Sequence, residues 1–334
     1  MRNSTGGNRR GGASGPAKPR AGAASRIHEG LVGARQLVGT PYLADARLRA
    51  EYDKEIAPRT TVALAKILRE VFPDPKALRA APRVLDIGAG TGAVGKALRT
   101  HFGTDLSLVE VDQVALGPTI RVADITNTAK LAALGAPFDL VVAAHVLNEL
   151  FVGELQSERT TRLSQLVRRW CETLVTASGT LILLEPALRD TSRMLLTVRD
   201  QVLAAGLHIV APCFFTGPCP ALFQERDWCH DNTSAGSRRR VDFSYLVVRG
   251  HGEASVDPTR FRIVSDPLPE KGRLRLFGCG ISGRQPIVRL DRNTTALNQD
   301  MDKLVRGDIA HVSRTTFAQD GLRVDGESAV TRES

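Results

Sequence analysis

The stretch VLDIGAGTGAVGKAL, residues 84–98, decides the fold of this chain. An apolar run interrupted only by Asp86 comes first, and Gly88, Gly90 and Gly92 then lead into residues with the apolar periodicity of a helix. Glycines at these positions allow a tight turn and let the backbone approach a ligand at the helix N-terminus. The stretch therefore predicts a buried strand, a ligand-binding turn and a helix.

The residues around the turn indicate which ligand it takes. The spacing Gly88-x-Gly90-x-x-Ala93 also suits a dinucleotide. However, a carboxylate at Asp86 would repel a pyrophosphate, whereas it could pair with the amino group of S-adenosylmethionine. Glu110 closes the next apolar run, where a carboxylate could accept both ribose hydroxyls. The alternative is a plain strand–helix turn without a ligand.

Further polar residues follow the next two apolar runs. Asp124 closes the run 120–124 and could receive the adenine amino group. His145, Asn148 and Glu149 follow the run 138–144, at the sheet edge that substrates approach. Ordinary capping or surface roles would explain these residues equally well.

Apolar runs alternate with helical segments between residues 76 and 250, which predicts an α/β domain with a mainly parallel sheet. Strands are expected at 83–87, 105–110, 120–124, 138–144, 180–185, 207–212 and 243–250, and helices near 92–101, 155–177 and 189–205. Residues 1–26 are expected to be a disordered basic tail, 27–75 an N-terminal helical segment, 251–316 a β-rich module and 317–334 a flexible tail.

Four of the five cysteines form a candidate metal site: Cys213, Cys219 and Cys229 in the cysteine-rich loop 211–230, and Cys279 in the β-rich module. Thiolates bind soft metals, so the set predicts zinc or an iron–sulfur cluster. Zinc sites usually carry close cysteine pairs, which are missing here, and a cluster tolerates wider spacing. Separate buried thiols or two disulfides are the alternative. Cys171 lies on the apolar face of the helix 155–177 and is interpreted as a core residue.

The length and hydropathy set the frame for these sites. With 334 residues, 42% of them hydrophobic, the chain can bury one large core and a smaller one. No apolar run reaches the roughly 18 residues that span a bilayer, and no secretory segment is recognisable. We expect a protein without a membrane partner in a reducing compartment, the bacterial cytoplasm or alternatively the mitochondrial matrix.

The net charge of +9 is concentrated near the start, where residues 1–26 carry six basic side chains and no acidic one. A cationic segment of this kind suits binding to a phosphate backbone, although a solubilising extension is an equal alternative. Two smaller basic clusters lie at Arg238–Arg240 and Lys271–Arg275.

The chain resembles a known family over roughly residues 40–312. The resemblance rests on LDIGAGTG (85–92), HVLNEL (145–150), LLEPA (183–187), the block from APC (211–213) through CP (219–220) to DWCH (227–230), FSYLV (243–247) and LVRGD (304–308). This order is similar to that of the mitochondrial and bacterial methyltransferase-like proteins that assemble the small ribosomal subunit. Asp231 stands where an aromatic is expected, and no tryptophan precedes Gly307.

The resemblance implies a class I methyltransferase (Rossmann-like) sheet with a C-terminal β module, S-adenosylmethionine as cofactor, and a [4Fe–4S] cluster on the four cysteines. It also implies small-subunit rRNA and the immature subunit as partners, with a monomer away from the ribosome. We expect an assembly protein with weak or no catalytic activity, because no Asn-Pro-Pro-Tyr sequence follows the fourth strand. The alternatives are an active rRNA methyltransferase and a small-molecule methyltransferase with structural zinc.

Overall fold

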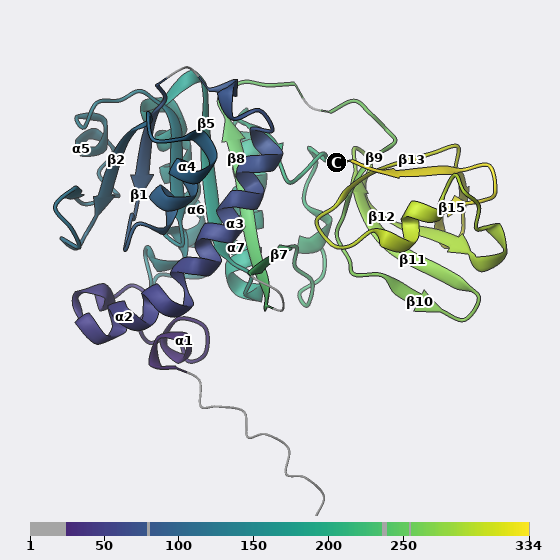
Figure 1. The fold of residues 1–334 in the computed structure, drawn as a ribbon, viewed down its shortest axis with the longest axis horizontal. Coiled ribbons are helices and arrows are strands. Elements are labelled where there is room, and N and C mark those ends of the chain that lie inside the picture. The colour runs from purple at the N-terminus through teal and green to yellow at the C-terminus, as the bar shows by residue number, and fades with distance from the viewer. Residues whose placement is uncertain (1–24, 79–80, 236–238, 254, 334) are drawn as a thin grey trace, which may run out of the picture.

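The computed structural model describes residues 25–78, 81–235, 239–253 and 255–333 (Figure 1). The predicted basic tail, apart from Ser25 and Arg26, lies outside the described residues, and so does Arg238. Ser25 accepts a hydrogen bond from the His28 amide and caps the first helix, α1 (Arg26–Leu31). The predicted tail therefore extends two residues too far.

A sheet of eight strands forms the centre of the larger domain, in the order β3-β2-β1-β4-β5-β8-β6, with β7 paired to β8. Its strands are β1 (Arg83–Ile87), β2 (Ser107–Asp112), β3 (Ile120–Val122), β4 (Phe138–Ala144), β5 (Val175–Pro186), β6 (His208–Ala211), β7 (Asp231–Ala235) and β8 (Arg239–Arg249). The first five are parallel, and β8 runs antiparallel between β5 and β6. An antiparallel strand inserted at this place defines the class I methyltransferase fold, so the predicted fold class is confirmed.

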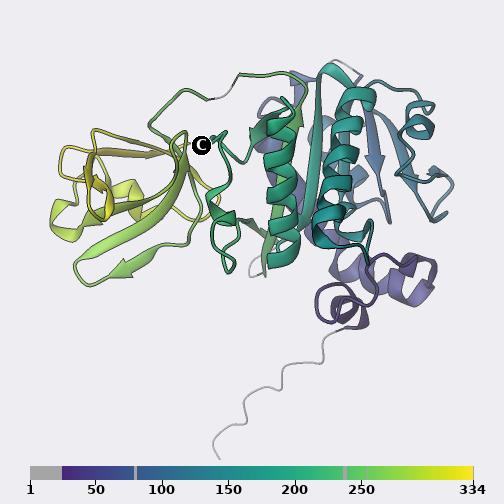
Figure 2. The same cartoon turned by 180° about the vertical axis from the view of Figure 1, so that it is seen from behind.

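Helices cover both faces of this sheet (Figures 1 and 2). On one face lie α3 (Ala57–Val71) and α4 (Ala93–Phe102), and on the other α6 (Gln156–Leu174) and α7 (Arg189–Ala204). Two further helices, α2 (Ala46–Glu55) and α5 (Thr128–Ala132), lie at the edges, and short 3-10 turns occupy Tyr42–Ala44, Pro75–Ala77, Leu147–Glu149, Pro220–Leu222, Asp291–Asn293 and Gln299–Lys303. Cys171 is buried between α6 and the sheet, as predicted.

The C-terminal module contains a second sheet of eight strands, in the order β14-β15-β12-β11-β9-β13-β16, with β10 paired to β11. Its strands are β9 (Arg260–Ile263), β10 (Leu268–Glu270), β11 (Arg273–Gly280), β12 (Gly283–Leu290), β13 (Ile309–Ser313), β14 (Thr316–Ala318), β15 (Gly321–Val324) and β16 (Ala329–Arg332). The expectation of a flexible tail at 317–334 is wrong. Strand β15 pairs with β12 and β16 with β13, and both bury apolar side chains.

Helix α3 joins the module to the sheet domain. Glu70 of α3 forms an ion pair with Arg262 of β9, which is only 4% exposed. The Tyr245 hydroxyl of β8 donates to the same carboxylate at 3.0 Å. One turn earlier, Lys66 donates to Asp231 at 2.8 Å. Since buried charges are stable only when paired, this network fixes how the module sits on the sheet.

Candidate functional site

The glycine turn has the predicted conformation. Gly88, Gly90 and Gly92 have φ values of 76°, 54° and 86°, which favour glycine. A Cβ atom on Gly88 would lie 2.5 Å from Cγ2 of Val146, so a side chain there would displace the loop that follows β4. The turn thus presents bare backbone at the start of α4, as a ligand requires.

Asp86 is completely buried at the end of β1, and among the described residues neither of its carboxylate oxygens has a hydrogen-bond partner. Burial, together with the nearby carboxylates of Glu110 and Asp112, raises the pKa of Asp86 well above its usual range. Unpaired buried carboxylates are costly, so this one suits a cationic ligand group such as the amino group of S-adenosylmethionine.

Glu110 does not end its strand, because β2 continues to Asp112. Glu110 accepts a hydrogen bond from Thr119 at 3.1 Å and lies beside α4, where a Cβ on Gly95 would be 3.0 Å away. Asp112 instead accepts the Gly90 amide at 2.9 Å, directly in the glycine turn. The sequence interpretation overlooked Asp112, although VEVD places two carboxylates on one face of a strand.

Asp124 lies beyond β3, which ends at Val122, and not at the end of the strand. Its Oδ1 atom accepts hydrogen bonds from the Thr126 amide at 2.9 Å and the Thr126 hydroxyl at 2.7 Å. These bonds lower the pKa of Asp124. They are the contacts of a turn cap, the alternative that the sequence left open.

His145 and Glu149 line a cavity of about 280 Å³ at the carboxyl edge of the sheet, together with Tyr42 and Tyr52. Burial lowers the pKa of His145 to about 4, and its Nε2 lies 3.0 Å from the Thr60 hydroxyl of α3. Burial raises the pKa of Glu149 to about 7, even though its carboxylate accepts the Tyr42 hydroxyl at 3.1 Å. The cavity can therefore exchange a proton near neutral pH.

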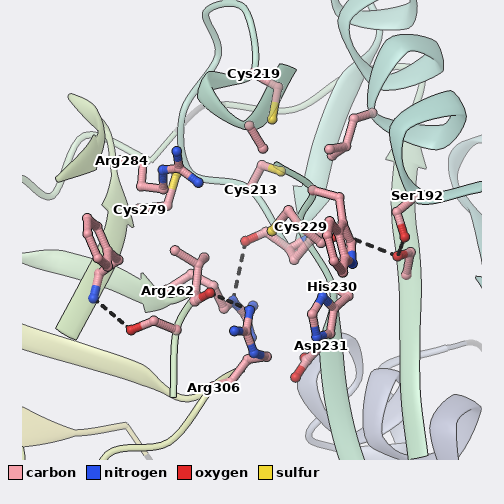
Figure 3. Close-up of a pocket in the computed structure, with 18 of the residues that line it drawn as sticks. Ser192, Cys213, Cys219, Cys229, His230, Asp231, Arg262, Cys279, Arg284 and Arg306 are labelled. Carbon is pink, nitrogen blue, oxygen red and sulfur yellow. Dashed lines mark hydrogen bonds between the residues drawn. The ribbon is translucent and has the colours of Figure 1, made fainter. Parts of the chain in front are cut away.

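The four predicted cysteines lie around one cavity of about 440 Å³ between the sheet domain and the module (Figure 3). Cys213, Cys219 and Cys229 come from the cysteine-rich loop, and Cys279 comes from β11. All are free thiols. The structure thus brings together residues that are up to 66 positions apart in the sequence.

Burial and the neighbouring thiols raise the pKa of Cys219 to about 11 and that of Cys279 to about 12. The pKa of Cys229 is raised well above its usual range, first by burial and then by the three other cysteines. Such a group ionises readily only when a cation joins it. Within the described ranges, however, no three His, Cys, Asp or Glu side chains are arranged to hold one metal ion.

A family model described as the mitochondrial small ribosomal subunit protein Rsm22 matches residues 52–266, well over half of the chain. The chain belongs to the Rsm22 family. The matched range contains the glycine turn and three of the four cysteines, and it ends before Cys279.

Solved structures similar to this Rsm22 chain include a putative ribosomal RNA methyltransferase from Plasmodium falciparum, with 16% identity over 56% of this chain and 95% of that one and a TM-score of 0.32. Fibrillarin from Aeropyrum pernix, with natively bound S-adenosylmethionine, has 13% identity over 57% and 76% of the two chains and a TM-score of 0.32. The ribosomal protein L11 methylase from Lactobacillus delbrueckii has 15% identity over 57% and 79%, and a TM-score of 0.31. At these values the fold assignment rests on the strand order.

No curated protein matches the Rsm22 chain. Among its described helices, none combines the length and apolar character needed to cross a bilayer.

Proposed function

We propose that this protein assembles the small ribosomal subunit by binding its rRNA, and that it carries a [4Fe–4S] cluster on Cys213, Cys219, Cys229 and Cys279. Catalysis is weak or absent in this proposal. The observation that carries it is the match to the Rsm22 family, whose description names the mitochondrial small ribosomal subunit. The partners are immature small subunits, in the mitochondrial matrix or a bacterial cytoplasm.

The cysteine cavity supports a cluster better than a single zinc ion. Zinc sites usually carry close cysteine pairs, which this chain lacks. A cluster is wider, because each of its irons takes one thiolate. Four free thiols around one cavity of about 440 Å³ fit that requirement. The bound cluster would supply positive iron centres that stabilise the thiolates and link the loop to the module.

The glycine turn and the carboxylates beside it fit S-adenosylmethionine, which supplies an activated methyl group when bound. Gly88, Gly90 and Gly92 would approach its carboxylate end, and Asp86 would face its amino group. Asp112, with Glu110 beside it, would accept the ribose hydroxyls. His145 remains a candidate for the methyl-acceptor side, whereas Asp124, expected at the adenine, is engaged by Thr126.

An active rRNA methyltransferase is the second candidate, and the cavity beside His145 and Glu149 favours it. A carboxyl group with a pKa of about 7 can take up the proton that an acceptor nitrogen releases. Tyr42 in the cavity wall offers an aromatic ring against which a base could stack.

Protein purified without oxygen tests the metal proposal. We expect brown protein with about four irons and four acid-labile sulfides per chain, and loss of both in Cys279→Ser. Cys171→Ser is the matched control and should keep its iron, because Cys171 of α6 packs in the hydrophobic core of the sheet domain. One zinc per chain and no sulfide would contradict the cluster.

Ribosome profiles separate the two candidates. We expect Cys229→Ser to deplete small subunits, whereas Asp112→Asn has a mild effect. If Asp112→Asn is equally severe and a methyl mark disappears from the rRNA, catalysis is the function.

A further inference from the structure

One helix, α7, holds the cysteine-rich loop by hydrogen bonds that extend from Phe215 to Asp227. Helix α7 packs on the sheet face that α6 also covers. Three of its polar side chains reach the loop between the cysteines. The loop has only a single 3-10 turn of its own, at Pro220–Leu222, so its shape depends on contacts from outside.

Arg193 of α7 holds the segment between Cys219 and Cys229. Its Nη1 shares two N–H bonds among the carbonyl oxygens of Ala221 at 3.1 Å, Gln224 at 2.8 Å and Asp227 at 2.6 Å, and its Nη2 donates to that of Leu222 at 3.4 Å. A guanidinium can serve several carbonyls at once because its donors lie in a rigid fork, which a lysine lacks.

Arg199 and Asp200, almost two turns later, hold the segment between Cys213 and Cys219. Arg199 is 1% exposed and donates to the carbonyl oxygens of Phe215 and Gly217. Asp200 pairs with Arg199 and accepts the backbone amide of Cys219 at 2.9 Å. Because the two charges balance each other, the pair shapes the loop without adding net charge beside the thiols.

The same helix reaches the third cysteine through two hydroxyls. Ser192 of α7 hydrogen-bonds Ser244 of β8 at 2.7 Å, and Ser244 donates to the carbonyl oxygen of Cys229 at 3.3 Å. Helix α7 thus holds the Cys219 backbone directly and the Cys229 backbone through Ser244, and Figure 3 shows Ser192 on the side of the cavity opposite Cys279.

We infer that Arg193, Arg199 and Asp200 are positioning residues of the cysteine site, which fix the cysteine-rich loop before a metal group binds. This inference rests on the proposed function for the identity of the metal group. The inference adds that the entropy cost of ordering the loop is met during folding and not when the metal group binds. Removing a residue that orients a metal ligand without touching the metal typically lowers metal affinity by about 10-fold to 100-fold.

The test uses full-length protein purified without oxygen, in the variants Arg193→Lys, Arg199→Lys, Asp200→Ala and Asp200→Asn. We expect the first three to lose the cluster in air about tenfold faster than the wild type, measured by visible absorbance. Asp200→Asn should stay close to the wild type, because its amide oxygen can still accept the Cys219 amide. An unchanged circular dichroism spectrum and unchanged S-adenosylmethionine affinity show that the fold is intact.

Arg189 and Asp190 provide a matched control on the same helix. They form the same type of neighbouring ion pair, but their side chains are 48% and 83% exposed. The variant Arg189→Lys with Asp190→Ala should lose the cluster at the wild-type rate. If it behaves like the Arg199 and Asp200 variants, or if those variants match the wild type, the positioning role is wrong.

A second measurement, on metal-free protein, decides the inference even if the wild type binds no cluster. Trypsin can cut after Arg226, an exposed residue of the loop. We expect cleavage there to be about tenfold faster in Arg193→Lys and Asp200→Ala than in the wild type and the control, because an untethered loop opens more often. Equal cleavage rates would overturn the inference, whereas wild-type protein without iron would overturn only the proposed function.

Discussion

Asp112 and Glu110 lie on the same face of β2, yet only Asp112 contacts the glycine turn. Glu110 is held beside α4 by Thr119. The difference matters because an acceptor for the ribose hydroxyls has to stand next to the backbone that receives the cofactor.

Asp112→Asn should weaken S-adenosylmethionine binding by about tenfold, since hydrogen bonds to a charged acceptor are roughly twice as strong as neutral ones. The amide oxygen can still accept the Gly90 amide, so the turn should persist. Calorimetry measures the affinity, with Asp124→Asn as a control that should stay within about twofold. If Glu110→Gln weakens binding and Asp112→Asn does not, the two carboxylates have been assigned the wrong way round.

The sequence predicted the glycine turn and the four cysteines as site residues, but it did not predict a role for Asp112. The glycines and thiols belong to residue types whose chemistry is recognisable without knowing where an element ends. In VEVD, the choice between two carboxylates depends on a strand boundary, and such boundaries follow from pairing with β1 and β3 rather than from local composition. Asp124 was chosen in the same way, and it caps a turn.

Glu149 should make the stability of the protein depend on pH. Its pKa is raised by burial from 4.5 to about 7, so between these values the folded protein holds a proton that the unfolded chain has released. Stability from this group is thus present at low pH and is lost as pH rises to about 7.

The measurement is urea denaturation of the metal-free protein at several pH values. Relative to Glu149→Gln, the wild type should lose on the order of 3 kcal/mol of unfolding free energy over that interval and stay constant above it. Glu158→Gln, an exposed position on α6, should run parallel to the wild type. If the unfolding free energies of the wild type and Glu149→Gln depend on pH in the same way, the Glu149 carboxyl group is not buried.

Helix α3 contacts residues of both candidate sites. Thr60 near its start contacts His145 in the smaller cavity, and Lys66 and Glu70 near its end bind Asp231 and Arg262 beside the cysteines. Its amphipathic pattern predicted a helix, but its partners come from β7 and β9, which lie more than 160 residues later in the sequence. Such contacts follow only from the assembled fold.

Removing one partner of the buried pair should be strongly destabilising. Glu70→Gln leaves Arg262 buried with a weaker partner, so we expect a loss of about 3 kcal/mol in the free energy of unfolding. The exposed pair Arg168–Glu172 on α6 is the comparison, and Glu172→Gln should lose less than about 1 kcal/mol. Urea denaturation measures both, and equal small losses would show that the α3 pair is solvated.

At the scale of the molecule, the basic charge near the start should govern affinity for RNA rather than its specificity. Deleting residues 1–24 removes five cations and keeps Ser25, which caps α1. The slope of log affinity against log salt should flatten by about three, with S-adenosylmethionine affinity unchanged. Filter binding to small-subunit rRNA at several salt concentrations measures this, and an unchanged slope would assign the phosphate contacts to the folded domains.

The arrangement of the two domains was predictable in outline only. Alternating apolar runs indicated the parallel sheet, because its buried strands need apolar residues on both faces. Residues 317–334 were misjudged, since β15 and β16 are four residues each and bury only Leu322, Val324 and Val330. Strands this short gain their stability from pairing with β12 and β13, and the local sequence of β15 and β16 does not predict that pairing.

The cysteine-rich loop leaves the sheet at β6 and returns through β7 into β8, and β6 and β8 are hydrogen-bonded neighbours. Both ends of the loop are therefore anchored whether or not anything binds between the thiols. Releasing the loop from α7, as in Arg193→Lys, should therefore open a local unit of the protein and leave the sheet closed. Amide hydrogen exchange in that variant would be fast in residues 212–230 and slow in β5 and β8, and a melting curve that follows the whole molecule would not detect the change.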